Sequence, residues 1–275
     1  MKNFFHFLFS LLLQIINEFR NRYRDIKYYL VFGMRLKLDE QQKDYLSVLD
    51  NDGILIIPNY WESEKCDLVR NQLDDFISKH PEQLWIDDKQ SDFRANGFNF
   101  KSSQVQEFLD NEFLLSILEK SQRRGPLTYR FTLGSKVIVK KDNLGSGGGW
   151  HRDSIWERQV KAMLYLDDVE EENGPFQYIR YSHNSLRTIY HMIKYKFGYY
   201  KNRFKDSEIE PLVKSEKNNL ETVSGKKGTL VLFNSRAFHR GMPIKKGARY
   251  ALTNYYFNKD VLDKFKMVEK LNDKV

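Results

Sequence analysis

The chain has 275 residues, of which 41% are hydrophobic and 15% aromatic, and this composition provides apolar surface for one large globular core. Its single cysteine, Cys66, excludes an internal disulfide framework and a cysteine-rich zinc ribbon, so a bound metal would need histidine and carboxylate ligands. The formal net charge of +8 suits an acidic partner, either an anionic substrate, a membrane surface or nucleic acid. No nucleic-acid-binding module is recognisable, and we expect no nucleic acid partner.

Residues 1–36 form a distinct N-terminal segment, in which an apolar run from Phe4 to Ile16 precedes several arginines and Lys27. As a helix the run would span about 20 Å, whereas the hydrocarbon core of a bilayer is about 30 Å thick. No small-residue cleavage site of a secretory signal follows the run. We therefore expect a cytoplasmic protein with an amphipathic, basic N-terminal helix.

Two interpretations of this helix stay open. Its polar residues recur every three or four positions and would form a narrow stripe beside a wide apolar face: His6, Ser10, Gln14, Asn17 and Asn21. One interpretation is peripheral membrane contact through residues 4–27, with the helix lying in the plane of the interface. The other is a helix packed on the domain or in a dimer interface. The sequence indicates neither the covering partner nor the oligomeric state.

Residues 37–260 are expected to form the main domain. An amphipathic helix ends near Leu49, a short strand "ILIIP" follows the turn "DNDG", and a second helix carries Cys66 on its apolar side. Runs rich in β-branched and aromatic residues then occur at 127–140, 159–166, 174–179, 228–234 and 249–257. This order predicts an α+β fold with a mainly β core, an antiparallel jelly roll with flanking helices.

Residues 185–224 are too long for a simple connection between strands. Apolar residues at helical spacing and many lysines and arginines predict a helical basic insertion. It is interpreted either as a lid that recognises an anionic substrate or as a solvated basic helix. Residues 261–275 are expected to form a C-terminal tail or helix.

The stretch "GSGGGWHRDS", residues 145–154, brings a glycine run against candidate metal ligands. It is no phosphate-binding loop, because Trp150 stands where such a loop needs Lys and Ser or Thr. As a hinge entering a strand, it would place His151 and Asp153 on one face and Arg152 on the other. The triplet alone is a weak signal, so a metal site here requires a third ligand.

His239 provides that candidate, because it follows the strand at 228–234 after a short turn. Two histidines and one carboxylate occupy one face of an octahedral ion and leave the other open, which suits ferrous iron in oxygen chemistry. A structural zinc site would instead be closed and usually rich in cysteine. Arg249 opens the next strand, and its guanidinium could bind a carboxylate, such as the distal one of 2-oxoglutarate, through two parallel hydrogen bonds. The alternative is an edge arginine paired with an acidic side chain.

Four segments in order resemble the phytanoyl-CoA dioxygenase family of Fe(II)- and 2-oxoglutarate-dependent oxygenases: "NDGILIIPNYWESEKCDLVRNQLDDFI", "WHRD", "YLDDVEEENGPFQYIRYSH" and "KGTLVLFNSRAFHRGMPIKKGARYALTNYYF". The resemblance implies a double-stranded β-helix, cupin-like in architecture. It implies iron held by His151, Asp153 and His239, and 2-oxoglutarate held by Arg249. With O2 as co-reactant, such enzymes usually hydroxylate a C–H bond, and we expect no catalytic residue beyond the metal centre.

Departures from the family pattern shape further expectations. Gly241 stands where members often have a serine that helps to hold 2-oxoglutarate, so Lys140 or a water is expected to serve instead. Trp156 and Phe233 are candidate pocket walls. His183, in a segment that replaces a Pro-Gly-Ser-His turn, is interpreted as structural. Because Asp153 is retained, hydroxylation or a related oxidation is favoured over halogenation.

Two alternative functions remain at this stage. A cupin-like isomerase or lyase would use the same barrel and metal without O2, and a non-catalytic jelly-roll module would only bind acidic partners. The substrate is expected to be a small or conjugated organic molecule, and an anionic one would suit the basic insertion. Its identity cannot be read from the sequence.

Overall fold

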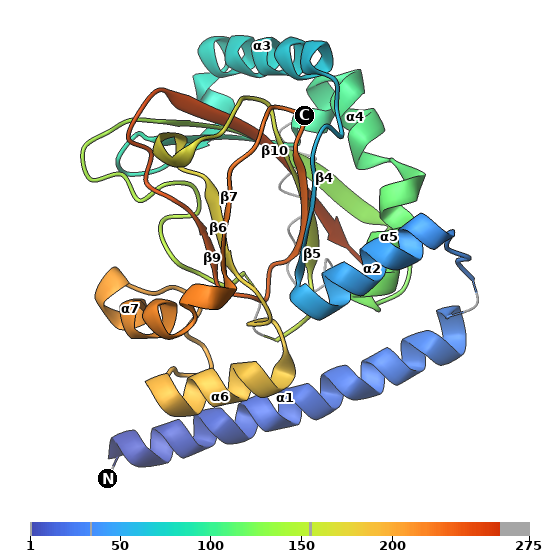
Figure 1. The fold of residues 1–275 in the computed structure, drawn as a ribbon, viewed down its shortest axis with the longest axis vertical. Helices are drawn as coiled ribbons and strands as arrows, with labels where there is room; N and C mark the ends of the chain where they lie inside the picture. Colours follow the sequence, from blue (N-terminus) through green and yellow to red (C-terminus); the bar gives the residue numbers. More distant parts are fainter. Residues whose placement is uncertain (1, 34, 154–155, 259–275) are drawn as a thin grey trace.

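The computed structural model describes residues 2–33, 35–153 and 156–258. The predicted C-terminal tail or helix at 261–275 lies outside them. Within the described residues, two antiparallel sheets face each other, and helices cover the larger sheet and the base of the molecule (Figure 1). This arrangement confirms the predicted jelly-roll fold with a mainly β core and flanking helices.

The larger sheet has the spatial order β1-β8-β5-β10-β4-β3-β2. Its strands are β1 (Ile54–Ile57), β2 (Leu84–Ile86), β3 (Asp92–Asn96), β4 (Tyr129–Ile138), β5 (Val160–Tyr165), β8 (Leu230–Asn234) and β10 (Ala248–Phe257). The smaller sheet has the order β7 (Leu220–Val223), β6 (Phe176–Ile179), β9 (His239–Gly241). An isolated bridge between His151 and His239 continues it past β9.

The central strands of the larger sheet are buried on both faces, and their side chains alternate between two cores. Met163 and Phe233 belong to the core between the sheets, whereas Leu164 and Leu232 belong to the core under the helices. The covering helices are α2 (Glu40–Asp52), α3 (Ser63–Lys79), α4 (Ser103–Leu109) and α5 (Glu112–Gln122). Short 3-10 turns lie at Pro81–Gln83, Phe98–Lys101, Glu171–Asn173 and Lys217–Asn219. The space that holds the site therefore opens between the two sheets.

The region of the predicted insertion contains two helices, α6 (Ser185–Tyr195) and α7 (Asp206–Ser215), followed by β7. The helical spacing of apolar residues continues to Tyr200, but α6 ends at Tyr195 because Lys196 adopts the left-handed conformation, with φ 56°. The long helix α1 (Lys2–Phe32) crosses the base of the molecule and packs beside α6 (Figure 1). No described helix combines the length and the apolarity needed to cross a bilayer.

Candidate metal centre

The glycine run places His151 by allowing the backbone to approach its ring closely. Gly145, Gly147, Gly148 and Gly149 all have positive φ, which residues with side chains rarely adopt. A β-carbon at Gly147 would lie only 2.3 Å from Cε1 of His151. The His151 backbone exchanges two hydrogen bonds of 3.0 Å with His239, so the two histidines face each other across this bridge.

Both imidazoles are held in the same orientation. The Nδ1 atom of His151 lies 2.8 Å from the carbonyl oxygen of Gly149, and Nδ1 of His239 lies 2.8 Å from that of Ala237. A carbonyl oxygen only accepts, so each Nδ1 carries the proton and each Nε2 keeps its lone pair free for a metal. Burial and the neighbouring His239 lower the pKa of His151 to about 3, so its ring is neutral at physiological pH.

Asp153 completes the cluster. Its Oδ2 lies 3.3 Å from Nε2 of His239, and its Oδ1 lies 3.8 Å from Nε2 of His151. One ligand atom from each of the three residues falls within 4.8 Å of the others. These neutral imidazole nitrogens and a carboxylate are the donor types that a 2-His-1-carboxylate iron site requires. Their convergence therefore fits a single bound ion.

Lys161, on β5, pairs with the same carboxylate. Its Nζ lies 2.7 Å from Oδ2 of Asp153 and 4.0 Å from the centre of the Tyr255 ring. Burial disfavours the ionised form of Asp153, but Lys161 and the two imidazoles outweigh burial and hold its pKa well below the usual range. Conversely, Asp153 keeps the pKa of Lys161 raised in spite of burial. Asp153 is thus a carboxylate at every physiological pH.

Arg249 lies at the start of β10 and is buried beside the metal-ligand cluster. Its Nη1 donates to the carbonyl oxygen of Gly174, whereas its Nε has no hydrogen-bond partner. Among the described residues, no carboxylate lies within ion-pair distance of it, and burial lowers its pKa. Gly241 leaves room for the guanidinium, because a β-carbon there would lie 2.8 Å from Nη2. The glycine that departs from the family pattern therefore makes space for Arg249.

One cavity joins these groups. Its lining includes His151, Asp153, His239, Lys161 and Arg249. Two more cations, Arg94 and Arg203, line it as well, together with the hydroxyl-bearing residues Ser135, Ser146, Thr253 and Tyr255. Within the lining, Asp153 is the sole carboxylate, so the cavity has an excess of positive charge.

The sequence-predicted residues are only partly brought together. Phe233 lines the cavity, its ring 5.4 Å from that of His239. Lys140 is exposed beyond the end of β4, and Trp156 packs against Tyr199, so neither belongs to the lining. His183 is buried outside the cavity, with its Nε2 3.1 Å from the carbonyl oxygen of Asp50.

Lys161 and Arg94 did not emerge from the sequence patterns. The sequence signal that could have identified them is a charged residue in the middle of an apolar strand. In "QVKAMLYL", Lys161 alternates with Met163 and therefore projects to the same face of the strand, toward the smaller sheet. Arg94 is held through Nε and Nη2 by Oδ2 of Asp92 at 3.0 and 2.6 Å. The neighbouring Asp92 thus holds the Arg94 guanidinium in place at the cavity.

Comparison with known proteins identifies the family to which this architecture belongs. The family model for phytanoyl-CoA dioxygenase matches residues 49–249, which is most of the chain. The chain belongs to the phytanoyl-CoA dioxygenase family. No match was found among curated proteins. As a family member, the chain is an Fe(II)- and 2-oxoglutarate-dependent enzyme with O2 as co-reactant, in agreement with the donor set in the cavity.

Solved structures share the fold at low sequence identity. The epimerase SnoN from nogalamycin biosynthesis, in complex with Fe3+ and alpha ketoglutarate, is 13% identical with a TM-score of 0.57, over 79% of this chain and 84% of that one. HygX from Streptomyces hygroscopicus, with nickel and 2-oxoglutarate bound, is 18% identical with a TM-score of 0.52, over 81% and 88%. The carbocyclase SnoK is 14% identical with a TM-score of 0.51, over 78% and 83%. These similarities are to the fold.

Proposed function

We propose that this chain is an oxygenase that hydroxylates a C–H bond of a small, anionic organic molecule. The observation that carries the proposal is the convergence of His151, Asp153 and His239 in one cavity with Arg249, whose guanidinium forms no ion pair with a described residue. The two imidazoles and the carboxylate would hold Fe(II), and Arg249 would hold the distal carboxylate of 2-oxoglutarate. When bound, the iron supplies O2 activation coupled to the oxidation of 2-oxoglutarate to succinate and CO2.

The residues of the chain prepare this chemistry in two ways. The carbonyl groups of Gly149 and Ala237 fix the imidazoles with Nε2 toward the shared site, so both rings are already oriented for a metal. Lys161 holds one oxygen of Asp153 and keeps the carboxylate ionised. Arg249 lacks a carboxylate of the chain within ion-pair distance among described residues, and a carboxylate ligand would relieve the cost of its burial.

Positive charge in the cavity supports an anionic substrate. Of the four cations in the lining, Lys161 is assigned to Asp153, Arg249 to the cosubstrate, and Arg94 is paired with Asp92, so Arg203 remains for a substrate. Nη1 of Arg203 donates to the carbonyl oxygen of Gly147 at 2.5 Å, so it is held beside the glycine run. A guanidinium positioned there would attract a carboxylate or phosphate group of a substrate.

Hydroxylation is favoured because the carboxylate ligand is intact, whereas the halogenating relatives lack it. The structural neighbours include an alpha ketoglutarate dependent epimerase and a carbocyclase, so proteins of this fold also perform reactions other than hydroxylation. HygX has been solved with hygromycin B bound and SnoN with nogalamycin RO, and both ligands are organic molecules rather than macromolecules. We infer a substrate of comparable, small-molecule class. Convergence of the ligands also supports an enzyme over a non-catalytic binding module.

The test is a cell extract incubated with the protein, iron and 2-oxoglutarate, first without O2 and then with it. Mass spectrometry should find a compound that gains one oxygen atom and succinate formed in step with it. The Asp153→Asn variant is the control. Succinate-free conversion without O2 would favour a cupin-like isomerase or lyase, and the absence of both turnover and 2-oxoglutarate binding would favour a binding module.

A further inference from the structure

The helix α1 is docked with its polar stripe inward and its apolar face outward. Gln14, Asn17 and Asn21 are at most 7% exposed, whereas Phe19 is 72% exposed and Leu30 81%. This is the reverse of an ordinary surface helix, whose apolar face covers the core. The buried polar stripe must therefore have polar partners in the domain. The exposed apolar face needs a covering surface that is not part of the described chain.

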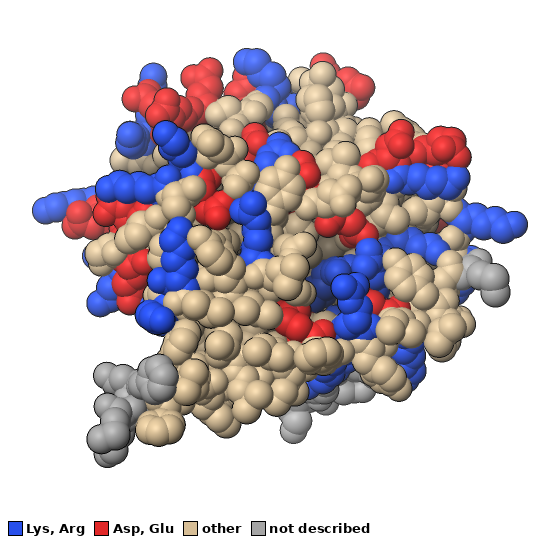
Figure 2. Space-filling view, turned by 60° about the horizontal axis from the view of Figure 1, so that its bottom comes forward, with Lys and Arg blue, Asp and Glu red and all other residues tan. Residues whose placement is uncertain are grey.

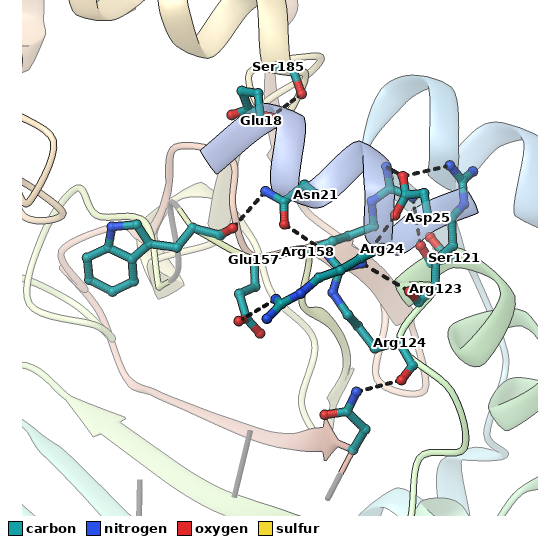
Figure 3. A network of polar contacts seen from close by, with 12 residues as sticks. Glu18, Asn21, Arg24, Asp25, Ser121, Arg123, Arg124, Glu157, Arg158 and Ser185 are labelled. Carbon is teal, nitrogen blue, oxygen red and sulfur yellow. Dashed lines mark hydrogen bonds and ion pairs between the residues drawn. The ribbon is translucent and has the colours of Figure 1, made fainter. Parts of the chain in front are cut away.

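The inward stripe is fixed by specific polar partners (Figure 3). The side-chain amides of Asn17 and Asn21 both donate to the carbonyl oxygen of Trp156, at 3.0 and 2.7 Å. Asp25 pairs with Arg124 at 3.2 Å, and Glu18 pairs with Arg236. If α1 turned over, these buried arginines would lose their partners, and a buried charge without its partner is strongly destabilising. The orientation is thus determined by the domain itself.

The outward face is long and continuous. Its exposed apolar residues, between 42% and 81% exposed, are Phe5, Leu8, Phe9, Leu12, Ile16, Phe19, Tyr23, Ile26, Tyr29, Leu30 and Val31. The helix has 31 residues and is therefore about 46 Å long. Figure 2 shows this end of the molecule as a broad area with few charged side chains. A monomeric soluble protein rarely leaves an apolar patch of this extent in water.

Helix α6 extends the same surface. Its outward residues Leu186 and Tyr190 are 78% and 50% exposed, and its inward residues include the polar Thr188 and His191. The Nζ atom of Lys196 lies 4.7 Å from the ring centre of Phe7 and joins the two helices. The outward sides of α1 and α6 form one surface with many exposed apolar residues, which is called the basal face below.

All outward charges on the basal face are positive. The two acids of α1, Glu18 and Asp25, both point inward to arginines, and α6 contains no acid. Arg22, Lys27 and Lys194 are exposed on the two helices. A second copy of the same face would bring cations to cations without an acid to pair them. An anionic phospholipid surface supplies both hydrocarbon for the apolar residues and phosphate for the cations.

We propose that the basal face docks the protein on an anionic phospholipid bilayer, with α1 lying in the plane of the headgroup boundary. The proposal commits to a lipid surface, and it is independent of the chemistry assigned to the cavity. The polar side of α1 remains bound to the domain, so α1 can attach the protein to the bilayer without separating from the domain.

The experiment is co-sedimentation of the full chain with vesicles of phosphatidylcholine alone or mixed equally with phosphatidylglycerol. The protein should pellet with the mixed vesicles and more weakly with the neutral ones. Leu12→Asn should weaken binding about ten-fold, because Leu12 is 53% exposed on the basal face. The matched control is Leu68→Asn on α3, at the opposite end of the molecule in Figure 1, where Leu68 is 47% exposed and should be without effect.

A charge variant separates the two contributions. Arg22→Gln combined with Lys27→Gln should weaken binding to the mixed vesicles roughly five-fold for each cation removed, and little to the neutral ones. Circular dichroism melting checks that each variant folds, which is expected because every changed side chain is exposed.

Three results would overturn the proposal. One is failure of the unaltered protein to pellet with the mixed vesicles. Another is equal binding by Leu12→Asn and Leu68→Asn. The third is a dimer in sedimentation velocity without lipid that Leu12→Asn dissociates, because a second copy would then cover the basal face.

Discussion

The cavity and the basal face break the usual rule of burial in opposite directions. The cavity encloses Lys161 and Arg249, charged groups that folding alone would leave in water. The basal face leaves Phe19 and Leu30 in water, although folding alone would bury them. Neither region makes sense as part of a self-contained fold. The occupants proposed above would account for both departures: a metal and anions in the cavity, and an anionic lipid surface at the basal face.

The largest expected effect is loss of the metal centre. Asp153→Asn or His239→Gln should lower the rate of succinate formation by about a thousand-fold or more, because the metal contributes several kcal/mol to the reaction. Fe(II) binding measured anaerobically by calorimetry should fall in parallel. His80→Gln, which changes a half-exposed histidine outside the cavity, is the matched control. Activity near the unaltered level in either ligand variant would show that the three residues do not form the centre.

Two adjacent residues on α1 test its inverted orientation. Glu18→Gln should lower the free energy of unfolding by about 3 kcal/mol, because it leaves the buried Arg236 without its ion-pair partner. Phe19→Gln, one position along the helix, should change it by no more than about 0.5 kcal/mol, since Phe19 is exposed. Urea unfolding without lipid measures both. Equal losses, or a larger loss for Phe19→Gln, would contradict the described docking of α1.

Arg249 tests whether the buried cation serves a ligand. Arg249→Gln should weaken 2-oxoglutarate binding about fifty-fold, because the guanidinium provides a charged, two-pronged contact to a carboxylate. Arg249→Lys keeps the positive charge but not the two-pronged geometry of the guanidinium. Its affinity for 2-oxoglutarate should lie between those of the unaltered protein and Arg249→Gln. Calorimetric titration of 2-oxoglutarate into the metal-loaded protein measures the series. Unchanged affinity in Arg249→Gln would assign the arginine to structure alone.

His183 is a buried histidine outside the cavity, and it allows the pH dependence of stability to be tested. Burial lowers its pKa to about 4, against 6.5 in the unfolded chain, so the folded state prefers the neutral ring. Stability from this site is fully present above pH 6.5 and is lost as the pH falls toward 4. Between pH 7 and pH 5 the loss should be about 2 kcal/mol. Urea unfolding of His183→Phe should show a pH dependence smaller by that amount, and an unchanged dependence would exclude His183 as the cause.

The fold was predictable from local patterns, because alternating apolar strands carry their information within short segments. His151 and Asp153 alone form a weak triplet, and His239 lies 88 residues after His151, so the three were joined mainly by the resemblance to a family. Their role as metal ligands stays a prediction, with which the convergence of their side chains agrees. Lys161 was not foreseen, because a lysine in a strand is usually on the solvent side, and only the facing smaller sheet makes that side a cavity. The assignment of Lys140 to the cosubstrate stays a prediction, although the residue lies outside the cavity lining.

The orientation of α1 could not be predicted for a similar reason. Its pattern shows a polar stripe and an apolar face, but a pattern does not say which side meets the domain. That choice depends on the carbonyl group of Trp156 and on Arg236, more than a hundred residues away. The cytoplasmic location likewise stays a prediction from the sequence.

The contacts of α1 with Trp156 and Arg236 also bear on how the protein would leave a membrane if the proposed docking is correct. Trp156 follows the candidate metal ligand Asp153 by three residues, and Arg236 precedes the candidate ligand His239 by the same interval. A protease that cut between α1 and α2 would remove α1 and, with it, the side chains that bind Trp156 and Arg236. The domain released by such a cut should therefore be less active, because the segments next to the candidate ligands would lose their contacts. An active enzyme in solution would require the whole chain, with α1 still attached, to dissociate from the membrane.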